Sequence, residues 1–185
     1  MQQSYAVPLW IFGYGSLLFR PAFPFEERRT AYITGFLRRL DQGSPDHRGT
    51  EERLGRVATL IREQGARAAG AVFRVAGHNV DDVLRDLDHR EKGGYDRISV
   101  EARFLDGTRA VPAITWIARP DNPYALGAAD LPTMLAQIRA AVGPSGPNIE
   151  YVLRLADTLR SLGIDDPYIE EIARALRVEA SPDSA

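Results

Sequence analysis

A glycine-rich turn follows the first apolar run of the chain and carries groups that could hold an anion. Leu9 to Phe12 are apolar, and Gly13-Tyr14-Gly15-Ser16-Leu17 follows them directly. Exposed backbone N–H groups in such a turn can bind a carboxylate or an oxyanion. A tight structural turn would use the same residues. Leu18 replaces the third glycine of a dinucleotide-binding fingerprint, and no Gly-Lys-Ser/Thr follows, so no nucleotide loop is predicted.

One carboxylate stands between two cations immediately before a second glycine turn. The segment reads Arg90-Glu91-Lys92-Gly93-Gly94-Tyr95. The glutamate in this segment is a candidate carboxylate for a functional site. The same composition is also typical of an ordinary helix C-terminus, with cations in the last turn and glycine after it. The residues alone leave both interpretations open.

The remaining groups with catalytic potential give no recognisable pattern. The three histidines lie in unlike contexts and lack metal-binding spacing: His47, His78 and His89. Asp46 and His47 could in principle join Ser16 or Ser44 in a catalytic triad, but triads are recognised by geometry and the spacing does not demonstrate one. The chain has no cysteine, which excludes a thiol nucleophile, a disulfide framework and a Cys-ligated metal.

The composition favours a folded protein with a small-molecule partner. Of the 185 residues, 44% are hydrophobic and 26% are charged, and the net charge is −2 with both signs mixed. The protein therefore has no strong electrostatic field that would favour binding to nucleic acid or to an acidic membrane surface. The first apolar stretch is short, interrupted by Pro8 and not preceded by a basic region. We therefore expect neither a signal peptide nor a membrane-spanning helix, and we expect a cytoplasmic location. We expect one domain over residues 1–178 and a disordered tail over 179–185.

The elements that must position these groups begin with six predicted strands in the first two thirds of the chain. The strands are short stretches rich in branched and aromatic residues: Leu9–Gly13, Ala31–Leu40, Arg56–Ile61, Ala69–Val75, Ile98–Leu105 and Ala110–Ile117. They predict a mostly antiparallel sheet or small barrel. The first of them delivers the glycine-rich turn at its C-terminal end.

Helical periodicity brings the candidate carboxylate to the end of a helix. Val80, Val83, Leu84 and Leu87 recur at helical spacing, Asn79 is the predicted N-cap, and the two glycines after Lys92 predict the stop. Glu91 would therefore lie at a helix end that faces the next strand.

The last third of the chain predicts three helices. Apolar stripes at helical spacing start at Leu131, Ile149 and Ile169, and the segment 143–147 separates the first two. Asp166 before Pro167 predicts an N-cap followed by proline at the first helical position. Trp116 and Tyr124 are interpreted as packing residues and not as a base-stacking platform, since no basic patch surrounds them.

Five segments, taken in order, resemble the ChaC family of gamma-glutamylcyclotransferases. They are FGYGSLLF at 12–19, QGSPDHRG at 42–49, GRVATL at 55–60, REKGGY at 90–95 and GPSGPNIEYV at 143–152. The chain departs from the family pattern at Asp41, where tryptophan is usual, and at Leu54, where proline is common. A possible charge at position 41 affects the expected peptide specificity more than the expected reaction.

The resemblance implies an α+β fold, with a small mixed, mostly antiparallel barrel, flanking helices and a helical C-terminal third. It implies that Glu91 is the catalytic base, that Tyr14, Gly15, Ser16 and Leu17 cradle the gamma-glutamyl group, and that Tyr95 and Tyr151 contact substrate. It further implies cleavage of glutathione to 5-oxoproline and Cys-Gly, without metal or cofactor, because the glutamyl α-amine is the nucleophile. The alternatives are a cyclotransferase for another gamma-glutamyl amine or peptide, a non-catalytic binding protein for such metabolites, and an interaction domain without a small ligand.

Overall fold

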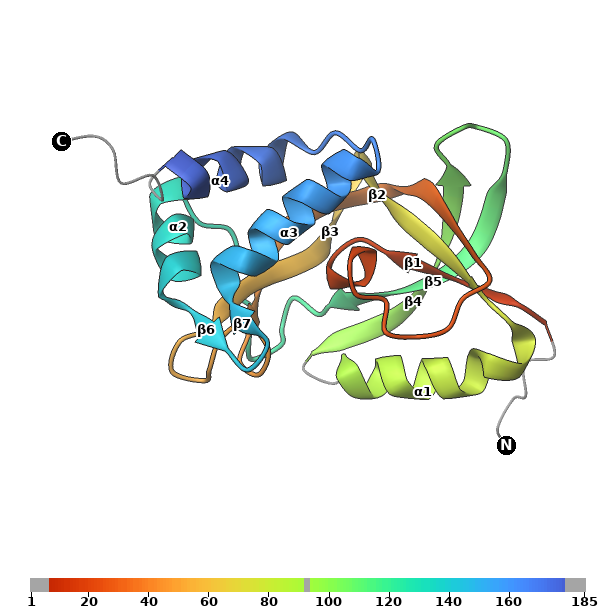
Figure 1. The fold of residues 1–185 in the computed structure, drawn as a ribbon, viewed down its shortest axis with the longest axis horizontal. Helices are drawn as coiled ribbons and strands as arrows, with labels where there is room; N and C mark the ends of the chain where they lie inside the picture. The colour runs from red at the N-terminus through yellow and green to blue at the C-terminus, as the bar shows by residue number, and fades with distance from the viewer. Residues whose placement is uncertain (1–6, 92–93, 179–185) are drawn as a thin grey trace. The chain divides into compact units, whose positions relative to one another are not determined.

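The computed structural model describes residues 7–91 and 94–178 (Figure 1). By its contacts the chain divides into two units, which are described separately. The first unit comprises Met1–Arg38 with Leu60–Pro123, and the second comprises Arg39–Thr59 with Tyr124–Ala185. The predicted tail at 179–185, and Lys92 and Gly93 of the second glycine turn, lie outside the described residues.

Five strands form a closed barrel, which confirms the predicted small, mixed and mostly antiparallel barrel. In chain order they are β1 (Leu9–Gly13), β2 (Glu27–Ser44), β3 (Gly55–Val75), β4 (Tyr95–Phe104) and β5 (Ala110–Ala118), and their order around the barrel is β1-β3-β2-β4-β5. β1 pairs antiparallel with β3 and parallel with β5, and β4 pairs antiparallel with β2 and β5. The parallel pair makes the barrel mixed.

The count of six strands was wrong, because β3 is one 21-residue strand that covers two predicted ones. The polar stretch at 62–68 separates Arg56–Ile61 from Ala69–Val75 in the sequence and looks like a loop. The strand nevertheless continues through it, since backbone pairing with the neighbouring strand does not require apolar side chains. Gly65 falls in this stretch with φ +81°, a conformation that glycine adopts without strain.

One helix packs against the barrel of the first unit and ends at the candidate carboxylate. The helix α1 (Val80–Arg90) buries the predicted stripe against Ile11, Leu17, Val75 and Trp116. Asn79 is the N-cap residue of this helix, as predicted, but its side chain makes no capping hydrogen bond. It is also the last residue of a short 3₁₀ turn, η2 (Gly77–Asn79), and its backbone N–H donates to the Ala76 carbonyl at 2.9 Å.

The second unit contains the predicted three helices: α2 (Leu131–Ala140), α3 (Asn148–Ser161) and α4 (Pro167–Val178). The predicted stripe of α4 is fully buried, and those of α2 and α3 are buried except for Leu131, Ile149 and Leu153, which are partly exposed. Asp166 accepts a hydrogen bond from the Ile169 N–H at 3.1 Å, which confirms the predicted N-cap before Pro167. The predicted separator at 143–147 contains a small hairpin of β6 (Val142–Gly143) and β7 (Gly146–Pro147).

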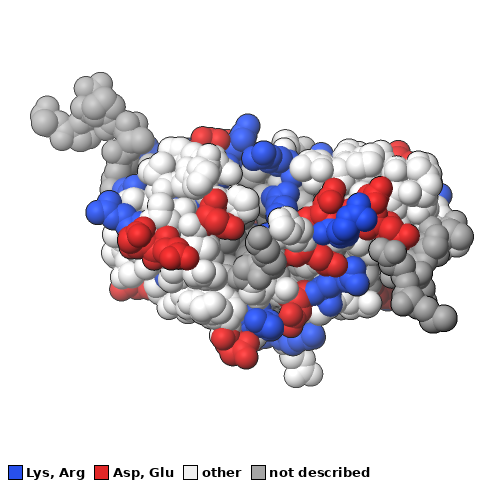
Figure 2. Space-filling model, turned by 90° about the horizontal axis from the view of Figure 1, so that it is seen from below, with Lys and Arg blue, Asp and Glu red and all other residues white. Residues whose placement is uncertain are grey.

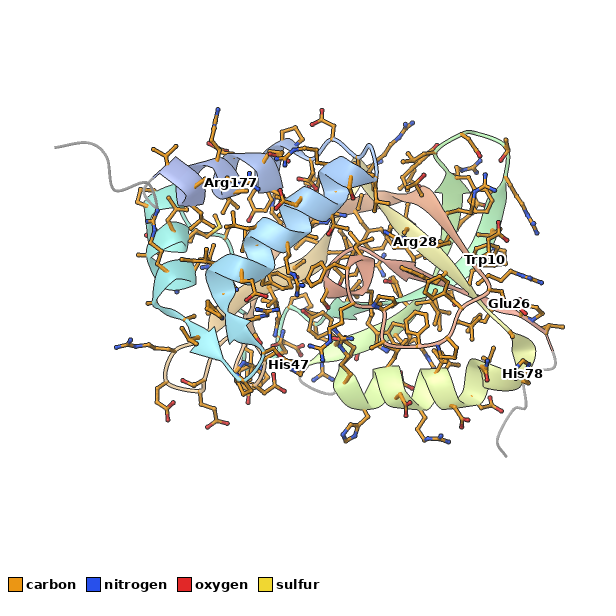
Figure 3. The ribbon with its side chains drawn as sticks, in the orientation of Figure 1. Trp10, Glu26, Arg28, His47, His78 and Arg177 are labelled. Atoms are coloured by element: carbon orange, nitrogen blue, oxygen red, sulfur yellow. The ribbon has the colours of Figure 1, made fainter. Side chains whose placement is uncertain are left out.

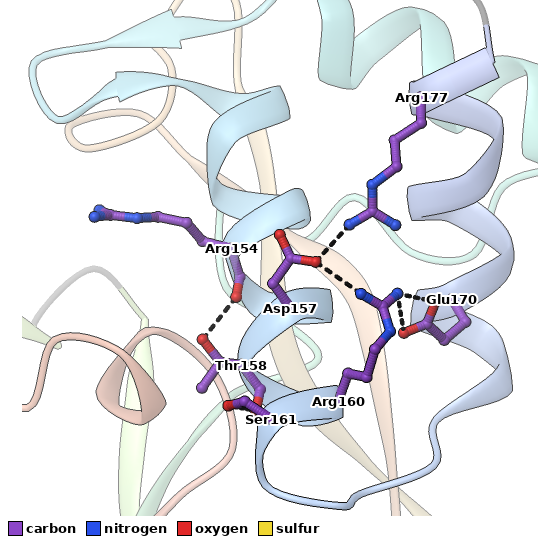
Figure 4. A network of polar contacts seen from close by, with 7 residues as sticks. All are labelled: Arg154, Asp157, Thr158, Arg160, Ser161, Glu170 and Arg177. Atoms are coloured by element: carbon purple, nitrogen blue, oxygen red, sulfur yellow. Dashed lines mark hydrogen bonds and ion pairs between the residues drawn. The ribbon is translucent and has the colours of Figure 1, made fainter.

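Exposed charges tie α3 to α4 (Figure 4). Arg160 donates to both carboxylate oxygens of Glu170, at 2.9 and 2.8 Å, and also to Asp157 at 2.9 Å. Arg177 donates to the same Asp157 oxygen at 2.7 Å. Isolated exposed ion pairs add little stability, but several charges joined in one network have a more defined geometry. This network therefore helps to fix how the two helices pair.

On the face shown in Figure 2, basic and acidic side chains are interspersed. Among the described helices, none combines the length and the apolar character that crossing a bilayer demands.

Candidate active site

The glycine-rich turn leaves β1 at Gly13 and closes as a short 3₁₀ turn, η1 (Ser16–Leu18). A Cβ atom at Gly13 would come within 2.9 Å of the Leu17 Cβ, so this position requires glycine. The Leu18 N–H donates to the Gly15 carbonyl at 3.0 Å. Leu17 and Leu18 are buried and anchor the turn, while Ser16 is partly exposed.

Two buried groups hold Tyr14, one at its side-chain hydroxyl and the other at its backbone carbonyl. Its hydroxyl donates to the Trp116 carbonyl at 2.6 Å, and its own carbonyl accepts from the Arg38 Nε at 2.8 Å. Arg38 lies on β2, is 3% exposed and also donates to the Ala69 carbonyl. The Tyr14 side chain is therefore built into the barrel, and its contribution to a binding site would come from the backbone.

The Arg38 contact also orients the next peptide N–H. The peptide between Tyr14 and Gly15 is trans, so its C=O and N–H groups point in opposite directions. Because the Tyr14 carbonyl points at Arg38, the Gly15 N–H points away from that guanidinium. This geometry suits the binding of an anion on the side of the turn away from Arg38.

Glu91 lies at the C-terminal end of α1 and is linked to the turn through Arg90. The Arg90 Nε is 3.5 Å from the Glu91 Oε1, and the Arg90 Nη2 donates to the Ser16 Oγ at 2.7 Å. The two side chains of this pair are 25% and 21% exposed, so both remain open to a ligand. The Arg90 guanidinium thus joins the carboxylate to Ser16, which lies 74 residues before Arg90 in the sequence.

Arg90 is the site residue that the sequence reasoning missed. The available signal was its position beside Glu91, which was interpreted only as part of a charged helix end. Ser16, by contrast, was predicted as part of the cradle. The structure brings both sequence-predicted segments, the turn and the carboxylate, to the same guanidinium.

Tyr95 begins β4 and is joined to Glu91 through the backbone. Its N–H donates to the Glu91 carbonyl at 3.2 Å, and its partly buried ring packs against the core that contains Leu87 and Trp116. Gly94 precedes it with φ +113°, and a Cβ there would lie 2.7 Å from the Asn122 Cβ. Glycine is thus required at position 94 for both conformation and space.

Tyr151 lies in the second unit, on α3, and is 4% exposed. Its hydroxyl accepts a hydrogen bond from the Ala58 N–H at 3.0 Å, and the Arg48 guanidinium carbon lies 5.9 Å from the centre of its ring. These contacts describe a residue that is packed into its unit. The predicted contact of Tyr151 with substrate stays a prediction.

Two of the five motifs pack against each other in the second unit. In the loop after β2, the His47 carbonyl accepts from the Ser145 N–H at 2.9 Å, and Arg48 donates to the Pro147 carbonyl at 3.2 Å. A Cβ at Gly143 would overlap the backbone of His47, so the glycine permits this close approach. The motifs at 42–49 and 143–152 therefore have a structural reason for their composition.

A buried guanidinium organises the middle of the same unit. Arg56, at 2% exposure, donates to the Leu40 and Gly127 carbonyls, at 2.8 and 3.0 Å, and to Gln137. Burial lowers the pKa of Arg56, and the nearby Asp41 carboxylate opposes that shift. Burial likewise raises the pKa of Asp41, against the charges of Arg56 and Arg39. Asp41, the departure from the family pattern, thus lies beside this buried cation.

The histidines form no catalytic or metal-binding arrangement within the described ranges. The His47 Nε2 is 4.0 Å from Asp46, and both side chains are more than half exposed. Ser44 accepts hydrogen bonds from the His47 and Arg48 N–H groups, at 3.3 and 3.1 Å, which is a structural role in the loop. His78 lies in the turn before α1 (Figure 3), and residues 7–91 and 94–178 hold no cluster of three His, Asp or Glu side chains suited to a metal ion.

Comparisons with known proteins agree on one family. Residues 9–179 match the model of the family described as ChaC-like protein. The glutathione-specific gamma-glutamylcyclotransferase 1 of Danio rerio is 42% identical over 180 residues, which cover 94% of this chain and 91% of that protein. The glutathione-specific gamma-glutamylcyclotransferase of Escherichia coli K12 is 32% identical over 181 residues, which cover 95% and 77%.

A solved structure supports the same assignment. The crystal structure of a yeast gamma-glutamyl cyclotransferase specific to glutathione has a TM-score of 0.87 and 26% identity, and the match covers 93% of this chain and 96% of that one. The barrel, the helical C-terminal third and the ordered motifs are those of one protein family. The chain belongs to the ChaC-like family.

Proposed function

We propose that this chain is a gamma-glutamylcyclotransferase that degrades glutathione. The relatives that match most of its length carry this activity in their names. In the reaction, the α-amino nitrogen of the glutamyl residue attacks its own γ-carbonyl carbon. A C–N bond forms within a five-membered ring, the amide bond to cysteine breaks, and the products are 5-oxoproline and Cys-Gly. Glutathione supplies every atom of both products.

The protein's main tasks in this reaction are to fold the substrate and to move protons. Well-oriented intramolecular reactions reach effective molarities of about 10⁵ to 10⁸ M, so holding the amine against the carbonyl supplies much of the rate. The amine is an ammonium at neutral pH and must lose a proton before it can attack. The leaving amine of Cys-Gly must gain one.

Glu91 is the proposed base. Its carboxylate would take the proton from the substrate ammonium, and the resulting carboxylic acid is suited to return it to the leaving amine. The backbone N–H groups of the turn at 14–17 would hold the anionic part of the gamma-glutamyl group, or the oxyanion that develops on the γ-carbonyl. Contacts of Tyr95 and Tyr151 with substrate, and a cytoplasmic location, belong to the same proposal.

The observation that carries this proposal is the Arg90 link. Arg90 pairs with Glu91 and donates to Ser16, so the proposed base and the proposed cradle share one guanidinium. This link supports a joint action of the proposed base and the proposed cradle on one substrate. The substrate's glutamyl group carries both an ammonium and a carboxylate, which match a neighbouring base and N–H donors.

The test compares the wild-type protein with Glu91→Gln and with Glu171→Gln, an exposed glutamate on α4 that serves as the control. Each protein is incubated with glutathione, and 5-oxoproline and Cys-Gly are quantified by mass spectrometry. Since a general base contributes about 10² to 10⁴ in rate, Glu91→Gln should lose at least 100-fold while Glu171→Gln keeps its activity. A loss below tenfold in a folded Glu91→Gln protein would contradict the role of Glu91.

A panel of other gamma-glutamyl amines and peptides separates the substrate from the reaction. Turnover of one of these, and not of glutathione, would keep the cyclisation and replace the substrate. Binding of gamma-glutamyl compounds without any 5-oxoproline would instead identify a non-catalytic binding protein.

A further inference from the structure

Trp116 contacts both halves of the candidate site, although it lies on β5 and belongs to neither. Its backbone carbonyl accepts the hydrogen bond from the Tyr14 hydroxyl at 2.6 Å. Its indole Nε1 donates to the Asp88 Oδ1 at 2.8 Å. Trp116 is 4% exposed, and its ring packs in the core between β1 and α1. One buried residue thus bonds to the glycine-rich turn on one side and to α1 on the other.

The bond to Asp88 falls where it can set the position of Glu91. Asp88 lies on the last turn of α1, and Glu91 follows three residues later at the helix end. Residues three apart on a helix are neighbours on the same face. Any rotation or slide of the last turn that moved Glu91 would therefore also move Asp88 and stretch its bond to the indole.

Apolar packing alone would not define this position as tightly. The helix meets the barrel through Val80, Val83, Leu84 and Leu87, and hydrophobic contacts of this kind are non-directional. A hydrogen bond weakens steeply when its angle departs from linearity. The indole bond is directional and lies at the end of the helix that carries the proposed base, where a small displacement has the largest effect on chemistry.

We propose that Trp116 and Asp88 are positioning residues, which together hold the carboxylate of Glu91 in register with the turn at Tyr14. The inference rests on the proposed function, because it presumes that Glu91 and the turn act together on the substrate. Trp116 fixes the turn through its carbonyl and the end of α1 through its indole. Neither residue needs to touch the substrate.

The two oxygens of Asp88 allow this role to be separated from simple charge pairing. Oδ1 accepts from the indole, whereas Oδ2 is 3.2 Å from the Nη1 of Arg97. Asp88→Asn retains an oxygen that can accept from the indole but removes the negative charge. Asp88→Ala removes both, and Arg97→Ala removes only the ion pair.

The kinetic experiment measures kcat and KM for glutathione in four variants: Trp116→Phe, Asp88→Ala, Asp88→Asn and Arg97→Ala. Because a misplacement of about 1 Å can cost about 10²-fold in rate, Trp116→Phe and Asp88→Ala should lower kcat about tenfold or more, with KM changed less than about threefold. Asp88→Asn and Arg97→Ala should stay within about threefold of wild type. Should Trp116→Phe and Asp88→Ala also stay within threefold, or should Asp88→Asn lose as much as Asp88→Ala, the proposal is wrong.

A second readout does not depend on activity. The exchange of the Trp116 indole proton and of the Glu91 amide proton with solvent is followed by NMR in wild type, Asp88→Ala and Arg97→Ala. Asp88→Ala should speed both exchanges about tenfold, and Arg97→Ala should not. Unchanged exchange in Asp88→Ala would overturn the link even in an active enzyme. A wild-type protein that makes no 5-oxoproline but shows the expected exchange would refute the proposed function and leave the link intact.

Discussion

Replacing Asn148 by alanine should destabilise the protein through one buried backbone unit on β3. The Asn148 Oδ1 accepts from the Arg56 N–H at 2.7 Å, and its Nδ2 donates to the Arg56 carbonyl at 2.8 Å. The two residues are 0% and 2% exposed. Alanine at position 148 removes both bonds and leaves a donor and an acceptor in a region that water does not reach.

The size of the effect follows from these two groups. A buried polar group that loses its partner costs about 1 to 3 kcal/mol, so the loss should be about 2 to 6 kcal/mol. For a protein of this size, about 1 kcal/mol corresponds to about 2 to 4 °C in Tm, so the melting temperature should fall by roughly 5 to 20 °C.

Urea unfolding followed by circular dichroism measures the change directly. The matched control is Glu171→Ala on α4, an exposed site where the free energy of unfolding should change by less than about 0.5 kcal/mol. A loss below about 1 kcal/mol in Asn148→Ala, with an unchanged dependence on urea, would refute the reasoning. It would mean that neither Arg56 group had been left without a partner.

Three further variants test charge placement. Burial raises the pKa of Asp41, so the folded state disfavours the charged carboxylate. Asp41→Asn should therefore raise the Tm at pH 7, and the difference in Tm from wild type should disappear as the pH falls to 3.8 and below. A difference in Tm that does not change with pH would contradict this. Arg90→Met should lower kcat/KM for glutathione by about tenfold or more, because the link between Ser16 and Glu91 is lost. A kcat/KM within threefold of wild type, measured from the 5-oxoproline produced, would count against that link. Asp157→Ala should lower the Tm at low ionic strength, and lower it much less in about 1 M NaCl, because salt screens exposed ion pairs. An equal fall in Tm at both salt concentrations would show that the pairing is not electrostatic.

Local patterns predicted the elements whose signals are local. Leu9–Gly13 is the strand β1, and the stripe that starts at Val80 is buried on α1 as expected. Asp166 before Pro167 marked a helix start correctly, because an N-cap depends only on residues within one turn. The closed barrel was one of two arrangements that the strands allowed.

The errors arose where tertiary contacts override local pattern. The polar stretch at 62–68 interrupts apolar periodicity, yet β3 continues through it because its backbone is paired. Asn79 is the N-cap residue as predicted, but it also ends a 3₁₀ turn and its side chain makes no capping hydrogen bond. No periodicity could indicate that Arg56 is buried, because its partners come from positions 40, 127, 137 and 148.

The candidate site was predictable in its parts and not in its connections. The motifs marked the turn and Glu91, and their roles came from the family resemblance. The guanidinium of Arg90 and the indole of Trp116 join parts of the chain that are 74 and 28 residues apart. Such links depend on how β1, β5 and α1 meet, which a single sequence does not specify.

The arrangement around Tyr14 has a consequence for mutagenesis. The groups of the turn that could meet a substrate are peptide N–H groups, and every residue except proline supplies one. Alanine at Ser16 would remove the hydroxyl that accepts from Arg90 but would leave the peptide N–H groups in place, so it would underrate their part in the site. Two substitutions would test the peptide N–H groups of the turn directly. Ser16→Pro removes one of these groups, and a substitution at the distant Arg38 removes the donor that holds the Tyr14 carbonyl.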